Sequence, residues 1–197
     1  MRLALIAAVA FAGAVDAQVV LDRMALIVND KVIKASEIDR DLRVTSFINE
    51  TPLEFTPAAR KKAADRLIEQ ALIRREVNVA NYPPATDQEL NELLAQLKKQ
   101  RGARFASELK RYGITEEQLR KQLAWQITVL HFIEQRFRPG VQITDADVQD
   151  FLKKHVKMTR EQAEQQIAGE RVNTEFFNWL DRARKRATVE YREAALK

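Results

Sequence analysis

The sequence predicts a mainly α-helical protein that also contains a small antiparallel β-sheet. Three observations support this fold class. Only 5 glycines and 5 prolines occur among the 197 residues, which indicates long helices with short connections. Several segments begin with residue patterns typical of helix N-termini. Strand-forming residues are concentrated in two places, one near each end of the chain.

Residues 24–33 predict a β-hairpin. Met24–Val28 and Lys31–Ile33 are short apolar runs on either side of Asn29-Asp30, and these two residue types tolerate the left-handed backbone of a two-residue turn. Residues 187–192 alternate polar and apolar side chains and are rich in strand formers. An isolated hairpin is only marginally stable in water. We therefore expect the last segment to pair with the hairpin, so that both chain ends form one sheet.

Helix starts are marked by capping boxes, in which a hydroxyl residue is followed three positions later by an acid or amide. These pairs are Ser36/Asp39, Thr86/Glu89, Thr115/Gln118, Thr144/Asp147 and Thr159/Gln162. Thr56-Pro57 marks a sixth start, because proline is tolerated at the first helical position. Three glycines stand where helices should end: Gly102, Gly113 and Gly140. The predicted helices cover about 36–48, 57–80, 86–100, 103–112, 115–137, 144–155 and 159–185.

Residues 1–17 have the pattern of a cleavable secretory signal peptide. Arg2 precedes an apolar run over 3–14, and small residues suited to cleavage follow at 15–17. The apolar run is well short of the roughly 20 residues that a transmembrane helix needs, which disfavours an uncleaved anchor. We expect cleavage between Ala17 and Gln18, leaving residues 18–197 as one exported domain.

The composition offers little for catalysis or cofactor binding. The chain has no cysteine and only two histidines, His131 and His155, so it lacks the residues for a thiolate or histidine-rich metal site. Residues 145–150 begin like a calcium loop, but they lack its glycine at the sixth position and are better explained as the acidic first turn of a helix. We predict a protein that is not an enzyme and needs no cofactor.

The net charge of +5 permits contact with anionic lipid or polymers, but a solvated helical surface is the preferred explanation. Nucleic acid is not an expected partner of an exported protein. The basic residues at 182–186 complement the dipole of the last helix, and docking to an anionic surface is the alternative.

The helix expected over 115–137 is apolar on two faces. At about 100° per residue, one side carries Leu119, Leu123, Ile127, Leu130 and Phe137. Trp125, Val129 and Phe132 lie on nearly the opposite side. A central helix buried between neighbours would explain both faces. Alternatively, the Trp125 face lines an open groove for apolar segments of a partner. Phe176, Phe177 and Trp179 raise the same question, with burial as the preferred interpretation.

The segment from Leu21 to Ile33, followed by Ser36-Glu-Ile-Asp39, resembles the opening of the SurA-type periplasmic chaperones. Further similarities follow in that family's order over 64–73, 105–120, 141–148 and 179–191. The resemblance implies a mainly helical chaperone module whose small sheet unites the two chain ends. Members of this family also carry one or two parvulin-type prolyl isomerase domains between the helices matching 144–155 and 159–185. Here only residues 156–158 separate these helices.

The resemblance therefore implies the chaperone module without the isomerase domains. It implies an ATP-independent holdase in the periplasm that binds unfolded outer-membrane or other exported polypeptides, with no stable membrane insertion. Under this hypothesis the client contacts are Trp125, Val129 and Phe132. Two alternatives stay open, a peptidyl-prolyl cis-trans isomerase of the same family and a structural adaptor of an envelope complex.

Overall fold

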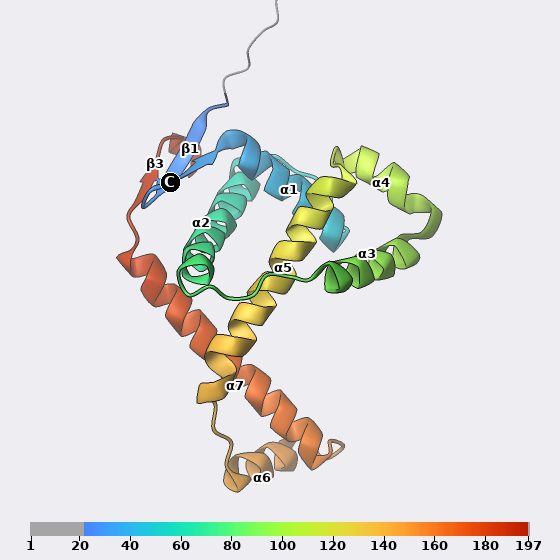
Figure 1. The fold of residues 1–197 in the computed structure, drawn as a ribbon, viewed down its shortest axis with the longest axis vertical. Coiled ribbons are helices and arrows are strands. Elements are labelled where there is room, and N and C mark those ends of the chain that lie inside the picture. Colours follow the sequence, from blue (N-terminus) through green and yellow to red (C-terminus); the bar gives the residue numbers. More distant parts are fainter. Residues whose placement is uncertain (1–21, 197) are drawn as a thin grey trace, which may run out of the picture.

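The computed structural model describes residues 22–196. This part of the chain contains seven α-helices and three strands, which confirms the predicted class (Figure 1). The elements are β1 (Met24–Val28), β2 (Lys31–Lys34), α1 (Ala35–Asn49), α2 (Pro57–Val79), α3 (Asp87–Arg101), α4 (Phe105–Tyr112), α5 (Glu116–Phe137), α6 (Asp145–Lys154), α7 (Arg160–Arg186) and β3 (Val189–Tyr191).

The two chain ends meet in one antiparallel sheet, as predicted, with strand order β2-β1-β3. Leu26 in the middle strand pairs with Ile33 on one side and Tyr191 on the other. Asn29 adopts the expected left-handed turn conformation, with φ of 53°. Its backbone N–H donates to the Thr188 carbonyl at 2.8 Å, and its side chain accepts from the Thr188 N–H at 3.0 Å. The turn residue of the hairpin therefore also holds the returning strand.

Four of the five predicted capping boxes are present. At Thr86, Thr115, Thr144 and Thr159, the hydroxyl accepts from the third helical N–H while that residue's side chain accepts from the threonine N–H. Thr56 also caps its helix, by accepting from the Ala59 N–H at 3.2 Å.

The predicted Ser36/Asp39 box is wrong. Helix α1 follows β2 without a loop, so its N-cap is Lys34, whose N–H donates to Glu37 at 2.9 Å. The Ser36 hydroxyl donates instead to Asp22 at 2.5 Å. Ser36 already lies inside the helix, where its hydroxyl cannot act as the N-cap acceptor.

Two of the three predicted glycine stops hold. Gly102 and Gly113 have φ of +55° and +63° and end α3 and α4. Gly140 is different, because it closes a short 3₁₀ turn over Arg138–Gly140 without positive φ. Pro139 in this turn has no N–H with which to continue the hydrogen bonds of α5, so the helix has already ended at Phe137.

The core consists of separate clusters along the body. The sheet packs against α1 and α2, where Leu26, Ile38 and Ile68 have no exposed surface. A second cluster joins α1, α3, α4 and the first half of α5. A third joins the ends of α2 and α5 to α7. Helix α6 packs on the first half of α7 through a small cluster around Val148, and together they project from the body as an arm (Figure 1).

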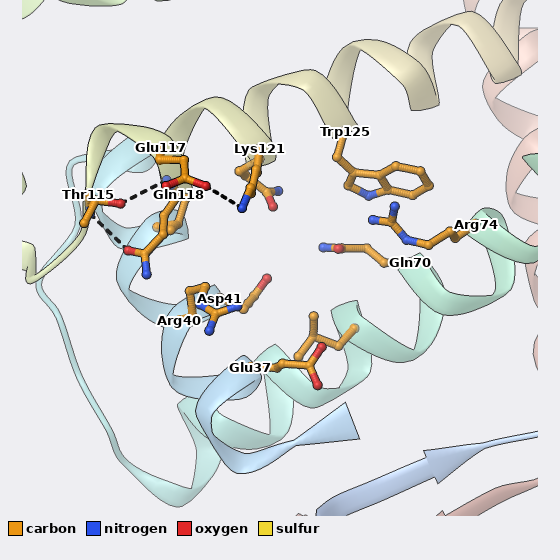
Figure 2. A pocket seen from close by; sticks show the side chains of 13 residues that line it. Glu37, Arg40, Asp41, Gln70, Arg74, Thr115, Glu117, Gln118, Lys121 and Trp125 are labelled. Atoms are coloured by element: carbon orange, nitrogen blue, oxygen red, sulfur yellow. Dashed lines mark hydrogen bonds and ion pairs between the residues drawn. The ribbon is translucent and has the colours of Figure 1, made fainter. Parts of the chain in front are cut away.

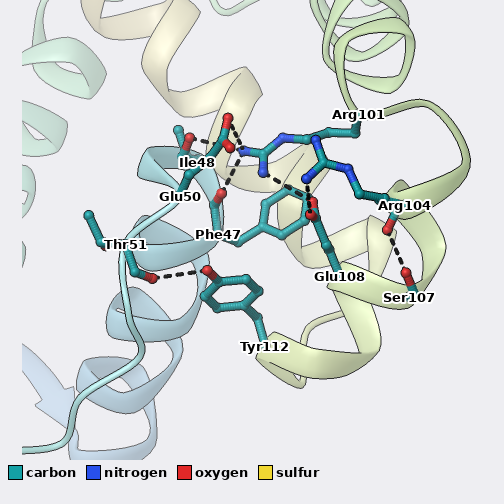
Figure 3. A network of polar contacts seen from close by, with 9 residues as sticks. All are labelled: Phe47, Ile48, Glu50, Thr51, Arg101, Arg104, Ser107, Glu108 and Tyr112. Carbon is teal, nitrogen blue, oxygen red and sulfur yellow. Dashed lines mark hydrogen bonds and ion pairs between the residues drawn. The ribbon is translucent and has the colours of Figure 1, made fainter.

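A buried arginine fastens α3 and α4 to the end of α1 (Figure 3). The Arg101 side chain is only 3% exposed. It donates to the carbonyls of Phe47 at 2.8 Å and Ile48 at 3.3 Å, which lie in the last turn of α1. It also forms a 3.0 Å ion pair with Glu108 and lies over the Phe47 ring. One cation thus serves as the C-terminal cap of one helix and the anchor of two others.

We expect Arg101→Ala to lower the free energy of unfolding by about 3–5 kcal/mol, because it removes the buried cation that pairs with Glu108 and donates to two carbonyls of α1. Urea denaturation measures this loss. Arg104→Ala is the matched control: Arg104 pairs with the same Glu108 at 3.6 Å, but its side chain is 67% exposed. Its removal should cost less than about 1 kcal/mol. Equal losses in the two variants would contradict the anchoring role of Arg101.

The cap of α3 should make stability depend on pH. Hydrogen bonds from Thr86 and His131 lower the pKa of Glu89 from 4.5 to about 2. A carboxylate with a depressed pKa stabilises the fold above its unfolded pKa and loses that effect as pH falls toward its folded pKa. Glu89→Gln should therefore be less stable than the parent protein at pH 7, and the difference should shrink between about pH 4.5 and 2. Thermal unfolding at several pH values measures it, and a difference independent of pH would refute this account.

Candidate functional site

Helix α5 is buried along both of its apolar faces over most of its length. Leu119, Leu123 and Ile127 pack into the cluster with α1, α3 and α4. On the opposite side, Trp125 and Phe132 pack into the cluster with α2 and α7. Over most of its length, α5 is therefore a central helix buried between neighbouring helices, which is the first of the two interpretations offered by the sequence.

Two residues of α5 depart from the predicted faces. Leu130, placed with the Leu119 face, is 60% exposed, and Phe137 packs with Phe132 and Trp179 on the other side. Leu130 borders the third hollow, which the last residues of α1, Ile48 and Asn49, also line. The last turns of α5 pack with α2 and α7, and Phe137 belongs to that cluster.

The predicted contact residues Trp125, Val129 and Phe132 do not share one environment. Phe132 has no exposed surface and makes edge-to-face contacts with Tyr82, Phe137, Phe176 and Trp179. Val129 is half-buried and lines an open hollow. Trp125 is 9% exposed and lines two hollows. The structure thus brings Trp125 and Val129 to one surface and places Phe132 in the core behind it.

Three hollows adjoin one another along α2 through shared lining residues, and together we call them the α2 groove. The first, of about 480 Å³, lies between α1, α2 and α5 (Figure 2). It shares Glu37 and Arg74 with a second hollow of about 1180 Å³ that reaches the hairpin turn. It shares Asp41 and Trp125 with a third, of about 530 Å³, bounded by Val129 and Leu130. Each hollow is large enough for several side chains of a ligand.

A stacked pair forms the middle of the groove. The Arg74 guanidinium on α2 lies 3.9 Å from the centre of the Trp125 ring on α5, and Figure 2 shows Gln70 beside it. Gln70 lines all three hollows. Such a cation–π contact contributes about 0.5–2 kcal/mol, depending on its exposure to water. Burial lowers the pKa of Arg74.

An ion pair joins α1, which forms one wall of the groove, to α2. Asp41 is 8% exposed and accepts from Arg66 on α2, with N–O distances of 3.0 and 2.5 Å. Burial raises the pKa of Asp41, and the Arg66 charge opposes this shift. Both residues line the third hollow. The ion pair therefore fixes the distance between α1 and α2 in this part of the groove.

Sequence reasoning missed Arg74 and Leu130 as groove residues. Arg74 lies in a helix rich in charged residues, so nothing local distinguishes it from a solvated surface charge. The angle of Leu130 around the helix predicts that this side chain is buried. Its exposure depends on where the neighbouring helices lie, which the sequence does not show.

The other candidate sites have structural explanations or lie outside the described residues. Arg184 in the basic segment pairs with Asp65 at 2.5 Å and Glu69 at 3.4 Å, and so joins α7 to α2.

Of the aromatic residues on α7, Phe176 and Trp179 are buried, whereas Phe177 is 62% exposed. The expected cleavage site at Ala17 and Gln18 precedes the described part of the chain. Within residues 22–196, no helix has both the length and the apolar composition needed to cross a bilayer.

Comparison with known proteins points to one kind of chaperone. No protein-family model matches the chain. Chaperone SurA of Hahella chejuensis is 27% identical over 139 residues, covering 68% of this chain and 32% of that protein. Chaperone SurA of Alcanivorax borkumensis is 28% identical over 138 residues, covering 67% of this chain and 32% of that protein.

The chain thus spans about a third of the length of the curated relatives it matches. Over about two thirds of its own length it is a distant relative of proteins named as chaperones. This agrees with the family resemblance drawn from the opening segment and its order of elements.

Proposed function

We propose that the protein is an ATP-independent periplasmic holdase that binds unfolded outer-membrane or other exported polypeptides in the α2 groove. The proposal includes export by the signal peptide at residues 1–17, with cleavage between Ala17 and Gln18, and a mature domain over 18–197. Binding is reversible and needs no cofactor, because burial of apolar client surface supplies the free energy.

The observation that carries the proposal is exposed apolar surface within a groove. Leu130 is 60% exposed and lies beside Val129 and Trp125 in the third hollow. An exposed apolar residue alone is ordinary, but one that continues a groove wall marks a surface for a partner. The distant similarity to proteins named chaperone SurA supports an unfolded polypeptide as that partner.

The test is suppression of aggregation. A urea-denatured outer-membrane β-barrel protein is diluted into buffer containing the mature chain, and light scattering is followed. Leu130→Ser should weaken suppression, because burying a leucine contributes about 1.5–3 kcal/mol. The concentration needed for half-maximal suppression should rise roughly tenfold.

Two further variants make this experiment discriminating. Phe177→Ser removes an apolar side chain of similar exposure, 62%, from α7 outside the groove, and it should leave suppression unchanged. Phe132→Ala creates a core cavity and should lower the free energy of unfolding by about 3–5 kcal/mol. Equal effects of Leu130→Ser and Phe177→Ser would argue against the groove as the client site. Failure of the parent protein to suppress aggregation would refute the holdase function.

We also propose that the chain does not catalyse prolyl isomerisation. Support comes from the connection between α6 and α7, which consists only of residues 155–159. In the family that the chain resembles, the isomerase domains are inserted at this place. The relatives are about three times longer than the matched stretch, which agrees with additional domains in them.

A protease-coupled assay checks this proposal with a proline-containing chromogenic peptide. We expect the rate of cis-to-trans conversion to equal the uncatalysed rate, which corresponds to a time constant of about 10–100 s at 25 °C. A parvulin-type enzyme serves as the positive control. A rate that increases in proportion to the concentration of the mature chain would show that the isomerase interpretation is correct.

A further inference from the structure

The Arg74–Trp125 stack places an uncompensated cation in the middle of the α2 groove. Within residues 22–196, Arg74 forms no ion pair, and its guanidinium donates no hydrogen bond. Arg66, two turns earlier on the same helix, is bound by Asp41. Arg74 therefore bears part of the cost of burial without the partner that normally offsets it.

The geometry of the stack leaves Arg74 free to bind an anion. The guanidinium carbon lies 3.9 Å over the centre of the Trp125 ring, and the N–H groups of a guanidinium lie in its own plane, where a ligand can accept from them. A planar guanidinium donates two parallel hydrogen bonds to a carboxylate, and this pairing is about twice as strong as a neutral hydrogen bond. A carboxylate is therefore the group best suited to this position.

Two of the three carboxylates that line the first hollow are in ion pairs, Asp41 with Arg66 and Glu117 with Lys121 at 2.7 Å. The third, Glu37, accepts from the Lys34 N–H but forms no ion pair within the described residues. On the α1 wall, opposite Arg74, Arg40 also forms no ion pair within the described residues (Figure 2). In the part of the chain that the structure describes, two cations without an ion pair, Arg40 and Arg74, thus share the first hollow with one such carboxylate, Glu37. The remaining excess of positive charge is complemented by a negatively charged ligand.

The course of the groove decides between two sources of that carboxylate. The groove continues from the stack in both directions, toward the hairpin turn and toward Leu130. An extended segment would therefore pass through it, with a residue of its interior opposite Arg74. This favours the side chain of an aspartate or glutamate over the carboxylate at a chain end.

We propose that the α2 groove selects extended segments in which an acidic side chain is flanked by apolar residues. The carboxylate binds Arg74, and the apolar side chains lie on Trp125 and Leu130. This inference rests on the proposed holdase function and names the kind of segment it prefers.

Isothermal titration calorimetry with short synthetic peptides tests the inference. One peptide carries a single glutamate between leucine and valine residues, and its twin carries glutamine there. Both are N-acetylated and C-amidated. A third peptide combines the glutamine sequence with a free C-terminal carboxylate. We expect the glutamate peptide to bind about tenfold more tightly than its twin, because a hydrogen bond to a charged group is stronger than one between neutral groups. The third peptide should bind like the glutamine twin.

Variants assign the preference to one residue. Arg74→Gln should abolish the difference between the glutamate and glutamine peptides. Arg74→Lys should keep part of it, because the charge is retained while the planar donor pair is lost. Arg182→Gln is the matched control: it removes the same charge from an exposed position of α7 outside the groove, and the preference should persist. Circular dichroism verifies that each variant is folded.

The outcomes separate this inference from the holdase function. Equal binding of the glutamate and glutamine peptides, together with normal suppression of aggregation, would overturn only the acidic preference. Tight binding of the third peptide alone would show that the groove recognises a chain end. Loss of the preference in Arg182→Gln as well as in Arg74→Gln would show that net charge, and not the stack, is responsible. Absence of both peptide binding and suppression would overturn both proposals.

Discussion

Helix α5 is apolar on two sides, and the arrangement of the body depends on satisfying both. Leu119, Leu123 and Ile127 require cover from α1, α3 and α4, whereas Trp125 and Phe132 require cover from α2 and α7. Because two separate cores share one helix, the helices on either side need not touch each other along their whole length. The α2 groove lies where α1, α2 and α5 leave space between them.

Polar interactions keep that space open and of constant shape. The Asp41–Arg66 pair joins α1 to α2, and Arg184 joins α2 to α7 through Asp65. At the other end, the sheet couples the start of the chain to its last strand, so α1 and α7 cannot separate without breaking strand pairing. A groove with fixed walls can bind and release an extended segment without refolding, as the proposed holdase function requires.

Much of the fold could be predicted because its signals are local. A threonine and an acid or amide three residues later contact each other in any helix, so four capping boxes were predicted correctly. The mistakes occur where a neighbour decides the outcome. Ser36 does not cap α1 because β2 runs directly into the helix. Leu130 is exposed because it borders the hollow between α1, α2 and α5, although its angle around α5 resembles that of buried residues.

The sequence by itself determined most of the helix starts, the sheet that joins the chain ends and the two apolar faces of α5, because these depend on spacing along the chain. Only the tertiary structure decided which apolar residues of α5 are core and which line the groove. It alone brought Arg74 onto Trp125, two residues far apart in the sequence. The physical reason is that burial and charge pairing depend on distances between helices, which the periodicity of one helix does not contain.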